Sequence, residues 1–503
     1  MPSFVWLIGF PLIASPVIYL AGRLVRRQTA IAGGVARWLG VLALAATWGP
    51  FLLAAINLNR LGVSTYTVGT ITLRLDGVSL LLAAVALGLA SLAALFSTRD
   101  IAGEPGEEKY YALLVASVGV MAGLGCADDL FNLWLWFEGL AVTTYLLVAF
   151  YRDQPTSLEA GVKYLVQSAA GSTLVLLGIA LVLMQTGTLS LSAMGAGLDA
   201  PRAPALLAAM ALLIIGFGVK AALVPLHTWL PDAHAQAPSG ISALLSGVVI
   251  AAGLVAMLRA VVPIVAREAL SAEAGLLFMA LGAVNMLCGN LLALRQTRVK
   301  RLLAYSSLAH IGYMLFGFGV AIYAQQAAGA EGGFFHLINH GLMKGLAFLA
   351  AGALVYALQA IPGQHAPLTV ADLAGAARRY PVVALALSVA VLGLGGLPPL
   401  AGFMSKWQIF VAGFSTHAAI VIVLVAFAAL NSVLSLAYYA PLVNSLYRQR
   451  PSEAVEHGRA IPLAMTAPLL ALGVLVVVVG FWPDLMTWLV GPAGTALIAV
   501  VGH

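Results

Sequence analysis

The chain has 503 residues, of which 62% are hydrophobic and only 9% are charged, and its formal net charge is +6. A soluble chain of this length would carry about a quarter charged residues, so the composition excludes an ordinary soluble enzyme and indicates a polytopic membrane protein. The basic residues are scattered among loops, which argues against a nucleic-acid partner. Cys126 and Cys288 form neither a disulfide framework nor a metal-ligand spacing.

Apolar runs long enough to cross a bilayer follow one another along almost the whole chain. The first run is followed, not preceded, by Arg23, Arg26 and Arg27, so we interpret it as a retained helix and not as a secretory signal. We expect an all-α protein of about 14 membrane-spanning helices, near residues 4–22, 38–57, 77–97, 110–126, 129–150, 158–184, 204–224, 239–262, 274–294, 302–324, 334–358, 381–404, 416–445 and 462–490.

The lysines and arginines of the loops test this count. Sixteen of them lie in loops that follow odd-numbered helices, and five lie in loops on the opposite side. Positive charge collects in cytoplasmic loops. The pattern therefore predicts a multi-pass protein of a bacterial or archaeal-type cell membrane, with both termini on the outer side.

Glycine and proline interrupt two of the segments, the seventh (IIGFGVKAALVPLHTWLP) and the twelfth (VLGLGGLPPLAGFMSKW). A membrane tolerates broken backbone only beside protein or a water-filled cavity, and corresponding breaks in two halves mark the transport site of many transporters. We predict discontinuous helices 7 and 12 within two inverted five-helix repeats. The predicted units are an N-terminal three-helix segment (1–109), the two repeats (110–262 and 263–447) and a C-terminal helix (448–503).

Five charged residues fall inside the apolar segments: Glu138, Lys163, Lys220, Lys344 and Lys406. A charge at bilayer depth costs at least about 2.5–3.5 kcal/mol, so these residues indicate an ion or proton path. Glu138 and Lys163 lie on adjacent helices, and we expect them to meet. Their contact is either a structural ion pair or one that breaks and reforms, and a unit charge about 4 Å away shifts its neighbour by about 4 kcal/mol at an effective dielectric near 20.

The order of the predicted repeats pairs Lys163 with Lys344, Lys220 with Lys406, and Glu138 with His310. His336, His340 and Lys344 are four residues apart and form one stripe of helix 11. Successive members lie about 6 Å apart along the axis, a distance that one water bridges, and histidine titrates near neutral pH. A proton relay is one interpretation.

Histidines satisfied within a polar core are the alternative to that relay. No carboxylate or cysteine completes a metal set around the two histidines of helix 11. Haem ligation would need His310 to face His336 or His340 across two helices.

Further polar side chains lie at three- and four-residue spacing on helix 10 or near the end of helix 7, where they could extend a relay or mark a proton entry or exit: Tyr305, Ser306, Ser307, His227 and His234. Serines in membrane helices often bond their own backbone instead. The chain contains no P-loop, dinucleotide fingerprint or cysteine cluster, so we expect no ATP, cofactor or redox centre. Energy for transport would come from an ion gradient or a partner subunit.

Five motifs, DDLFNLWLWFE, GVKAALVPLHTWLPDAHAQAP, RVKRLLAYSSLAHIGYM, FFHLINHGLMKGLAFLAAGAL and LPPLAGFMSKW, resemble those of the antiporter-like proton-translocating subunits over roughly residues 110–450. This superfamily comprises the large membrane subunits of complex I, Mrp-type sodium/proton antiporters and group 4 hydrogenases. The resemblance implies a 14-helix fold with inverted repeats. It also implies a hydrophilic axis in which Glu138, Lys163, Lys220, Lys344 and Lys406 match family positions.

One departure from the family pattern concerns helix 8. Many relatives carry a lysine or histidine there, but SGISALLSGVVIAAGLVAML has no titratable residue, and Ser246 and Ala251 stand near the expected position. The link between the two half-channels would then run through water, His310 or the helix 11 stripe. Otherwise this copy conducts poorly.

The resemblance implies a proton-translocating subunit of a complex I-like (NADH:quinone oxidoreductase-type) complex. Such a chain is part of a translocase, carries no redox centre itself and binds other membrane subunits. Two alternatives stay open. One is a subunit of an Mrp-type antiporter, which moves Na⁺ as well as protons, or of a group 4 hydrogenase. The other is a structural subunit that conducts nothing.

Overall fold

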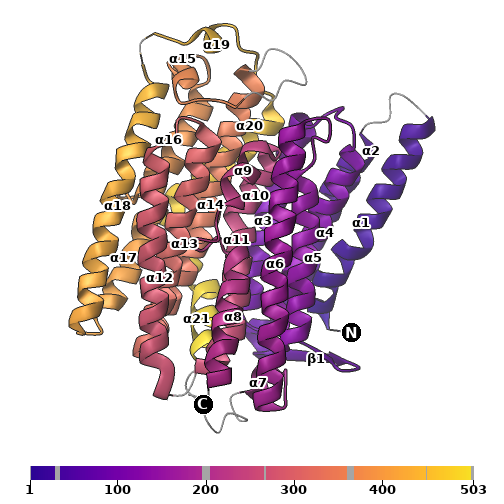
Figure 1. Cartoon of the computed structure of the whole chain (residues 1–503). Helices are drawn as coiled ribbons and strands as arrows, with labels where there is room; N and C mark the ends of the chain where they lie inside the picture. Colours follow the sequence, from indigo (N-terminus) through magenta and orange to yellow (C-terminus); the bar gives the residue numbers. More distant parts are fainter. Residues whose placement is uncertain are drawn as a thin grey trace.

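The computed structural model describes residues 2–28, 34–194, 204–265, 268–358, 367–448 and 450–499. They form a bundle of long helices with one small hairpin (Figure 1), which confirms the all-α polytopic class. Among these residues, 12 helices are long and apolar enough to cross a membrane. The predicted helices 7 and 12 correspond to shorter apolar helices of 17 and 15 residues. The total of 14 spans stays a prediction.

The N-terminal part consists of α1 (Ser3–Gln28), α2 (Val35–Leu61), the strands β1 (Ser64–Val68) and β2 (Ile71–Leu75), and α3 (Gly77–Asp100). The strands pair antiparallel from Ser64↔Leu75 to Val68↔Ile71. Asp76 caps α3 by accepting the backbone N–H of Ser79, while the Ser79 hydroxyl accepts the Asp76 N–H, a capping box. This cap fixes the direction in which the chain enters the bundle.

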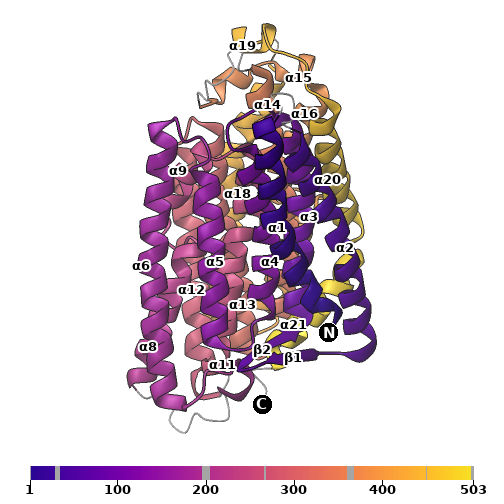
Figure 2. The ribbon, with the colours of Figure 1, turned by 90° about the vertical axis from the view of Figure 1, so that its right-hand side faces the viewer.

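The first predicted repeat contains α4 (Glu107–Cys126), α5 (Leu130–Val148), α6 (Pro155–Thr186), the short α7 (Leu191–Met194), α8 (Pro204–Lys220), α9 (Trp229–Gln236), α10 (Ser239–Leu244), a π-helical turn (Leu245–Val249) and α11 (Ile250–Val265). The described parts of the second contain α12 (Glu268–Leu294), α13 (Val299–Ala324), α14 (Ala327–Leu358), a 3₁₀ turn (Ala371–Leu373), α15 (Ala376–Arg379), α16 (Pro381–Gly395), α17 (Ala401–Phe414) and α18 (Ala419–Leu446). Figure 2 shows α6 and α8 along one edge of the bundle and α20 toward the other.

The chain ends with α19 (Glu453–Glu456), α20 (Leu463–Phe481), a 3₁₀ turn (Pro483–Met486) and α21 (Thr487–Ala499). The predicted single helix over 462–490 is therefore wrong. Trp482 precedes a proline and takes a non-helical conformation, with φ −128° and ψ 71°, which ends α20. α21 packs on α3 and α14. A Cβ on Gly77 would lie 2.1 Å from the backbone of Pro492, so only glycine fits this contact.

The two ends of the bundle differ in character, and we name them by their landmarks. The hairpin end carries β1 and β2, and the α15 end carries α15 and α19 (Figure 1). The marks for both chain termini lie toward the hairpin end.

Both predicted helix breaks are confirmed. α8 ends at Lys220 before α9 begins at Trp229, and α16 ends at Gly395 before α17 begins at Ala401. Gly396, between the latter two, has a φ of +82°, which favours glycine.

One backbone motif recurs in the two predicted repeats. It joins the residues just before α5 to those after α6, and the residues just before α13 to those after α14. The four N–H···O distances are all 2.9 Å, for Leu130→Leu189, Leu191→Asp128, Val299→Leu368 and Val370→Thr297. The first pair lies beside β2 and the second near α15, at opposite ends of the bundle. This recurrence supports the inverted repeats. When the two repeats are aligned on these four hydrogen bonds, Glu138 corresponds to Ser307. His310, the partner predicted for Glu138, lies one helical turn further along α13.

Candidate functional site

Lys220, the last residue of α8, is fully buried. Its Nζ donates to the Tyr164 hydroxyl at 3.0 Å and to Ser168 Oγ at 3.2 Å. Nζ also lies 4.6 Å from the centroid of the Tyr164 ring, and that ring stacks on Trp229 at 3.9 Å. Two hydroxyls and an aromatic face hold the ammonium, and within the described part of the chain no carboxylate contacts it directly. This cation can therefore change partners without losing a salt bridge.

Glu138 on α5 is half-buried, and its Oε1 is shielded from solvent without a hydrogen-bond partner among the described residues. Its charge acts on Lys220. The neighbouring Phe137 ring lies 5.5 Å from the Lys220 ammonium. The carboxylate thus stands near the lysine without pairing with it. A water molecule or a small movement would connect the two groups.

The predicted Glu138–Lys163 contact is wrong, and Lys163 is not buried. Its side chain is 47% exposed, and its Nζ pairs with Glu159 at 2.7 Å and with Asp232 at 3.0 Å. Asp232 on α9 also binds Arg301 at 2.6 Å. The contact does not form because Lys163 lies on the side of α6 that faces α9, whereas Glu138 is on α5. Lys163 therefore joins a charged cluster that ties the second half of the broken helix to α6 and α13.

Lys344 on α14 is fully buried. Its Nζ donates to the backbone carbonyl of Leu303 at 2.7 Å and to the hydroxyl of Ser306, both on α13. The Leu303 carbonyl also accepts the hydroxyls of Ser306 and Ser307, and a hydrogen bond from a charged donor such as this ammonium is stronger than a neutral one. Ser306 is therefore in direct contact with Lys344.

The histidine stripe of α14 meets α13 and α17 in a continuous contact. His310 Nδ1 and His336 Nε2 lie 3.0 Å apart, and His336 Nδ1 lies 2.9 Å from Ser405 Oγ. His340 is centred 5.3 Å from His310, and both of its ring nitrogens are buried without a hydrogen-bond partner in the part of the chain that the structure describes. The direct contact between His310 and His336 leaves no room for a porphyrin between them. The chain of groups can pass a proton from ring to ring.

Lys406 on α17 is the next residue after Ser405 in this line and is 2% exposed. Its Nζ donates to the carbonyl of Leu394 at 2.9 Å and to Ser432 Oγ at 2.8 Å. It also lies 4.5 Å from the centroid of the Tyr313 ring. The ammonium thus reaches back across the break and binds the carboxyl-terminal end of α16, where a helix favours positive charge.

The predicted helix 8 corresponds to α10, the π-helical turn and α11, and it contacts both halves without a titratable group between residues 239 and 258. Ser246, in the π-helical turn, shares a 2.7 Å hydrogen bond with Ser307, which also donates to the carbonyl of Leu303. A Cβ on Gly253 would lie 2.8 Å from the Ala221 nitrogen, next to Lys220, so α11 packs closely on the first break. Ala251 is fully buried and offers no polar group. At Ser246 and Ala251, predicted helix 8 therefore supplies no titratable side chain between Lys220 and the residues around Lys344, and the predicted gap is present in the structure.

Two further predicted residues lie apart from the line. The Tyr305 and His227 rings are edge to face with centroids 6.3 Å apart, and His227 Nδ1 is buried without a partner among the described residues. The other residue predicted to mark an entry or exit, His234, is fully buried on α9.

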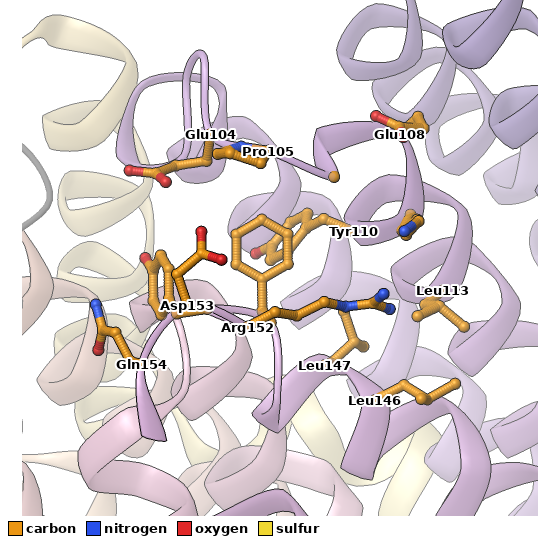
Figure 3. A pocket seen from close by; sticks show the side chains of 14 residues that line it. Glu104, Pro105, Glu108, Tyr110, Leu113, Leu146, Leu147, Arg152, Asp153 and Gln154 are labelled. Carbon is orange, nitrogen blue, oxygen red and sulfur yellow. The ribbon is translucent and has the colours of Figure 1, made fainter. Parts of the chain in front are cut away.

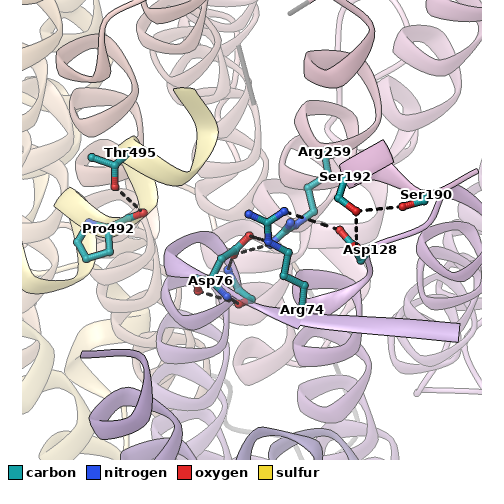
Figure 4. Close-up of polar contacts among 9 residues, drawn as sticks. Arg74, Asp76, Asp128, Ser190, Ser192, Arg259, Pro492 and Thr495 are labelled. Carbon is teal, nitrogen blue, oxygen red and sulfur yellow. Dashed lines mark hydrogen bonds and ion pairs between the residues drawn. The ribbon is translucent and has the colours of Figure 1, made fainter. Parts of the chain in front are cut away.

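The sequence reasoning missed a charged cluster at the hairpin end (Figure 4). Arg259 near the end of α11 binds Asp76 at 2.7 Å, and Arg74 lies 3.8 Å from Asp76 and 4.0 Å from Asp128. Ser192 donates to Asp128 at 3.0 Å. Burial raises the pKa of Asp128 above its usual value. The only local signal in the sequence was the capping pattern of Asp76, because its partners are far away along the chain.

These features define a class of membrane protein with two broken helices and a buried line of lysines and histidines between them. The chain belongs to the family described as NADH:quinone oxidoreductase/Mrp antiporter, transmembrane, whose profile matches residues 127–434. It is therefore an antiporter-like membrane subunit.

Individual relatives extend this match to most of the chain. It is 34% identical over 469 residues to the F(420)H(2) dehydrogenase subunit N of Methanosarcina mazei, covering 91% of this chain and 93% of that one. It is also 34% identical over 466 residues to the NADH-quinone oxidoreductase subunit N 2 of Roseiflexus castenholzii, with 89% and 88% covered. A chain of the membrane-bound sulfane sulfur reductase, an archaeal respiratory membrane complex, superposes with a TM-score of 0.86 at 27% identity, with 100% of both chains covered.

Proposed function

We propose that this chain conducts protons as one subunit of a complex I-like respiratory membrane complex. The observation that carries the proposal is the buried line of Lys344, His340, His310, His336, Ser405 and Lys406, which ends at a helix break. A buried line of this kind is costly to maintain and otherwise unexplained. The relatives named above are subunits of redox complexes, which favours this parent over a sodium/proton antiporter.

Each group in the line has a distinct role. Glu138 sets the field at Lys220, which exchanges its proton through the hydroxyls of Tyr164 and Ser168. The histidines relay the proton between Lys344 and Lys406. Lys163 stays outside the path, since its charge is neutralised at the surface. The redox chemistry that drives these transfers takes place in partner subunits.

We further propose that the α15 end faces the cytoplasm and that both termini face outward. The excess of lysine and arginine in loops at the α15 end supports this orientation. Reagents that cannot cross the membrane would label a cysteine at exposed Arg450 only from the inside. Labelling from the outside alone would reverse the assignment.

The test of conduction uses the whole complex in sealed vesicles, with Glu138→Ala, Lys220→Ala or Lys344→Ala in this chain. Proton uptake driven by the electron donor should fall by about tenfold or more in each variant. Arg450→Ala, an exposed change at the α15 end, is the matched control and should pump normally. Unchanged pumping in all three variants would instead favour a structural subunit. Pumping that needs Na⁺ would favour the antiporter.

A further inference from the structure

His234 lies one step beyond the stripe of His336, His340 and Lys344 on α14, the helix predicted as number 11. His336, His340, Lys344 and Phe348 follow at four-residue intervals on one face of α14. The His234 ring stacks on Phe348 with centroids 4.6 Å apart and planes 14° apart. The next position along the stripe, beyond Lys344 toward the α15 end, is therefore held by a histidine that comes from α9.

The environment of His234 does not account for its polar atoms. The side chain is fully buried, and neither Nδ1 nor Nε2 has a hydrogen-bond partner among the residues that the structure describes. An unsatisfied polar group in a dry interior costs about 1–3 kcal/mol. If the side chain had only a packing role, a phenylalanine at this position would fill the same space without this cost. The two free nitrogens therefore suggest water on both sides of the ring.

A lysine and an acid continue from His234 toward the α15 end. Lys300 acts on His234 electrostatically, as Lys344 does from the other side. The Lys300 Nζ donates to the carbonyl of Ala237, which follows α9, at 3.0 Å. Asp100, the last residue of α3, interacts with Lys300 and with the backbone N–H of Ser239. Its Oδ2 is shielded from solvent and has no hydrogen-bond partner in the described segments.

A cavity of about 450 Å³ opens beside these residues, between the α3–α4 and α5–α6 loops (Figure 3). Its lining includes the carboxylates of Glu104 and Asp153 and the ring of Tyr110. The Tyr110 hydroxyl shares a 2.6 Å hydrogen bond with Ser97, one turn before Asp100. Glu104 also acts electrostatically on Asp100. The cavity is large enough for several waters, and two residues of its lining, Glu104 and Tyr110, interact electrostatically with Asp100.

We infer that this cavity is the mouth of a proton inlet that reaches Lys344 through Asp100, Lys300 and His234, without passing Lys220 or the stretch of predicted helix 8 at Ser246 and Ala251. The inference rests on the proposed function. A proton from the cytoplasmic water enters at the Asp100–Lys300 pair and is taken up by one nitrogen of His234. The other nitrogen then releases its proton toward Lys344, and water carries each transfer across the remaining space. The stretch of predicted helix 8 near Ser246 and Ala251, which lacks a titratable side chain, then lies off this route and does not interrupt it.

Pumping by the complete complex in vesicles gives the first test, with His234→Gln and Asp100→Asn in this chain. Both changes keep the size of the side chain and remove its acid–base chemistry. We expect a fall of about tenfold or more in each, and normal pumping in the exposed control His457→Gln. If Lys344→Met stops pumping while His234→Gln and Asp100→Asn do not, the inlet is wrong and the conduction proposal stands. If Lys344→Met also pumps, the conduction proposal itself fails.

Accessibility gives a second test that does not depend on pumping. In a background with Cys126→Ala and Cys288→Ala, Asp100→Cys and His234→Cys are exposed to a small charged thiosulfonate from either side of the membrane. The inlet predicts modification of both from the α15 end and protection from the hairpin end. Protection of His234→Cys from the α15 end, with Arg450→Cys modified in the same vesicles, would overturn the inlet.

Discussion

In the break between α8 and α9, neutral side chains satisfy the freed backbone groups, whereas in the break between α16 and α17 a buried cation does so. In the first, Trp229 Nε1 donates to the Val219 carbonyl at 2.8 Å, and Asn285 Oδ1 accepts the Val224 N–H at 2.8 Å. In the second, Lys406 and Ser432 donate to the last carbonyls of α16.

This difference separates two kinds of buried lysine. Lys220 contacts hydroxyls and takes no part in holding its break, so its proton can leave without disturbing the backbone. Lys406 binds the end of α16 as a charged donor, and its neutral form would bind more weakly. We expect proton release at Lys406, but not at Lys220, to loosen the adjacent helix break.

The strongest test of this difference replaces each lysine by methionine. Both Lys220→Met and Lys406→Met should reduce pumping by about 10²-fold or more, because each removes a proton carrier. Only Lys406→Met should also destabilise the protein, by about 1–3 kcal/mol, since it leaves the Leu394 carbonyl without that donor. Vesicle pumping and thermal unfolding in detergent measure the two effects. Equal destabilisation by both variants would remove the distinction.

The two halves also differ in how their last helix is fastened. Asp76 and Arg259 tie α11 at the hairpin end by charge. α18 is tied near the α15 end by neutral bonds, with Ser445 Oγ donating to the Val370 carbonyl at 2.8 Å. Asp76→Asn leaves Arg259 without its close anionic partner, so the free energy of unfolding should fall by about 3–5 kcal/mol. Ser445→Ala, the matched change in the other half, should cost about 0.5–1.5 kcal/mol.

The charged fastening also makes the first half sensitive to acid. Burial would raise the pKa of Asp76, but the charge and hydrogen bond of Arg259 and the N–H of Ser79 outweigh it, and the net pKa lies below the ordinary value. Its stabilising effect is complete above the unfolded pKa of about 3.9 and is lost as the pH falls through the lower native value. Unfolding midpoints measured between pH 6 and pH 3 should therefore depend less on pH in Asp76→Asn than in the wild type. An unchanged slope would contradict this assignment.

A smaller effect is expected from the neutral groups at the two breaks. Asn285→Ala removes the acceptor of the buried Val224 N–H and a donor to the Ala222 carbonyl, and should cost about 1–3 kcal/mol. Ser432→Ala removes the donor to the Gly395 carbonyl and one acceptor of the Lys406 ammonium, which keeps the Leu394 carbonyl. An under-satisfied carbonyl is tolerated better than an orphaned N–H. Thermal unfolding of the two variants should rank Asn285→Ala as the less stable. The reverse order would mean that Ser432 contributes more to the stability of the protein than Asn285 does.

Much of this arrangement could be predicted from local sequence signals. Run lengths gave the class, glycine and proline gave both breaks, and four-residue spacing gave the stripe of His336, His340 and Lys344. These signals are local because a helix fixes which residues share a face. They do not fix which neighbour that face meets.

The misses follow from that limit. The Asp76–Arg259 pair joins residues 183 positions apart, at the ends of apolar runs where charge is unremarkable. His234 meets the stripe only because α9 packs on α6 and α13 after the break, in a position that stacks its ring on Phe348 of α14. Lys163 lies inside an apolar run, but the run has a side that faces away from the core, and packing of α6 against α8 and α9 decides which side that is.

The smallest pumping effect is expected at Lys163, the predicted repeat partner of Lys344. Its charge is neutralised at the surface by Glu159 and Asp232, and exposed pairs of this kind contribute little. Lys163→Met should therefore change pumping by at most about twofold. Arg301 would still hold Asp232 in place. Measured beside Lys344→Met in the same vesicles, the two lysines should differ by an order of magnitude or more. If Lys163→Met instead stops pumping as Lys220→Met does, the exposed cluster on α9 belongs to the path, and the first half-channel begins at the surface of α6.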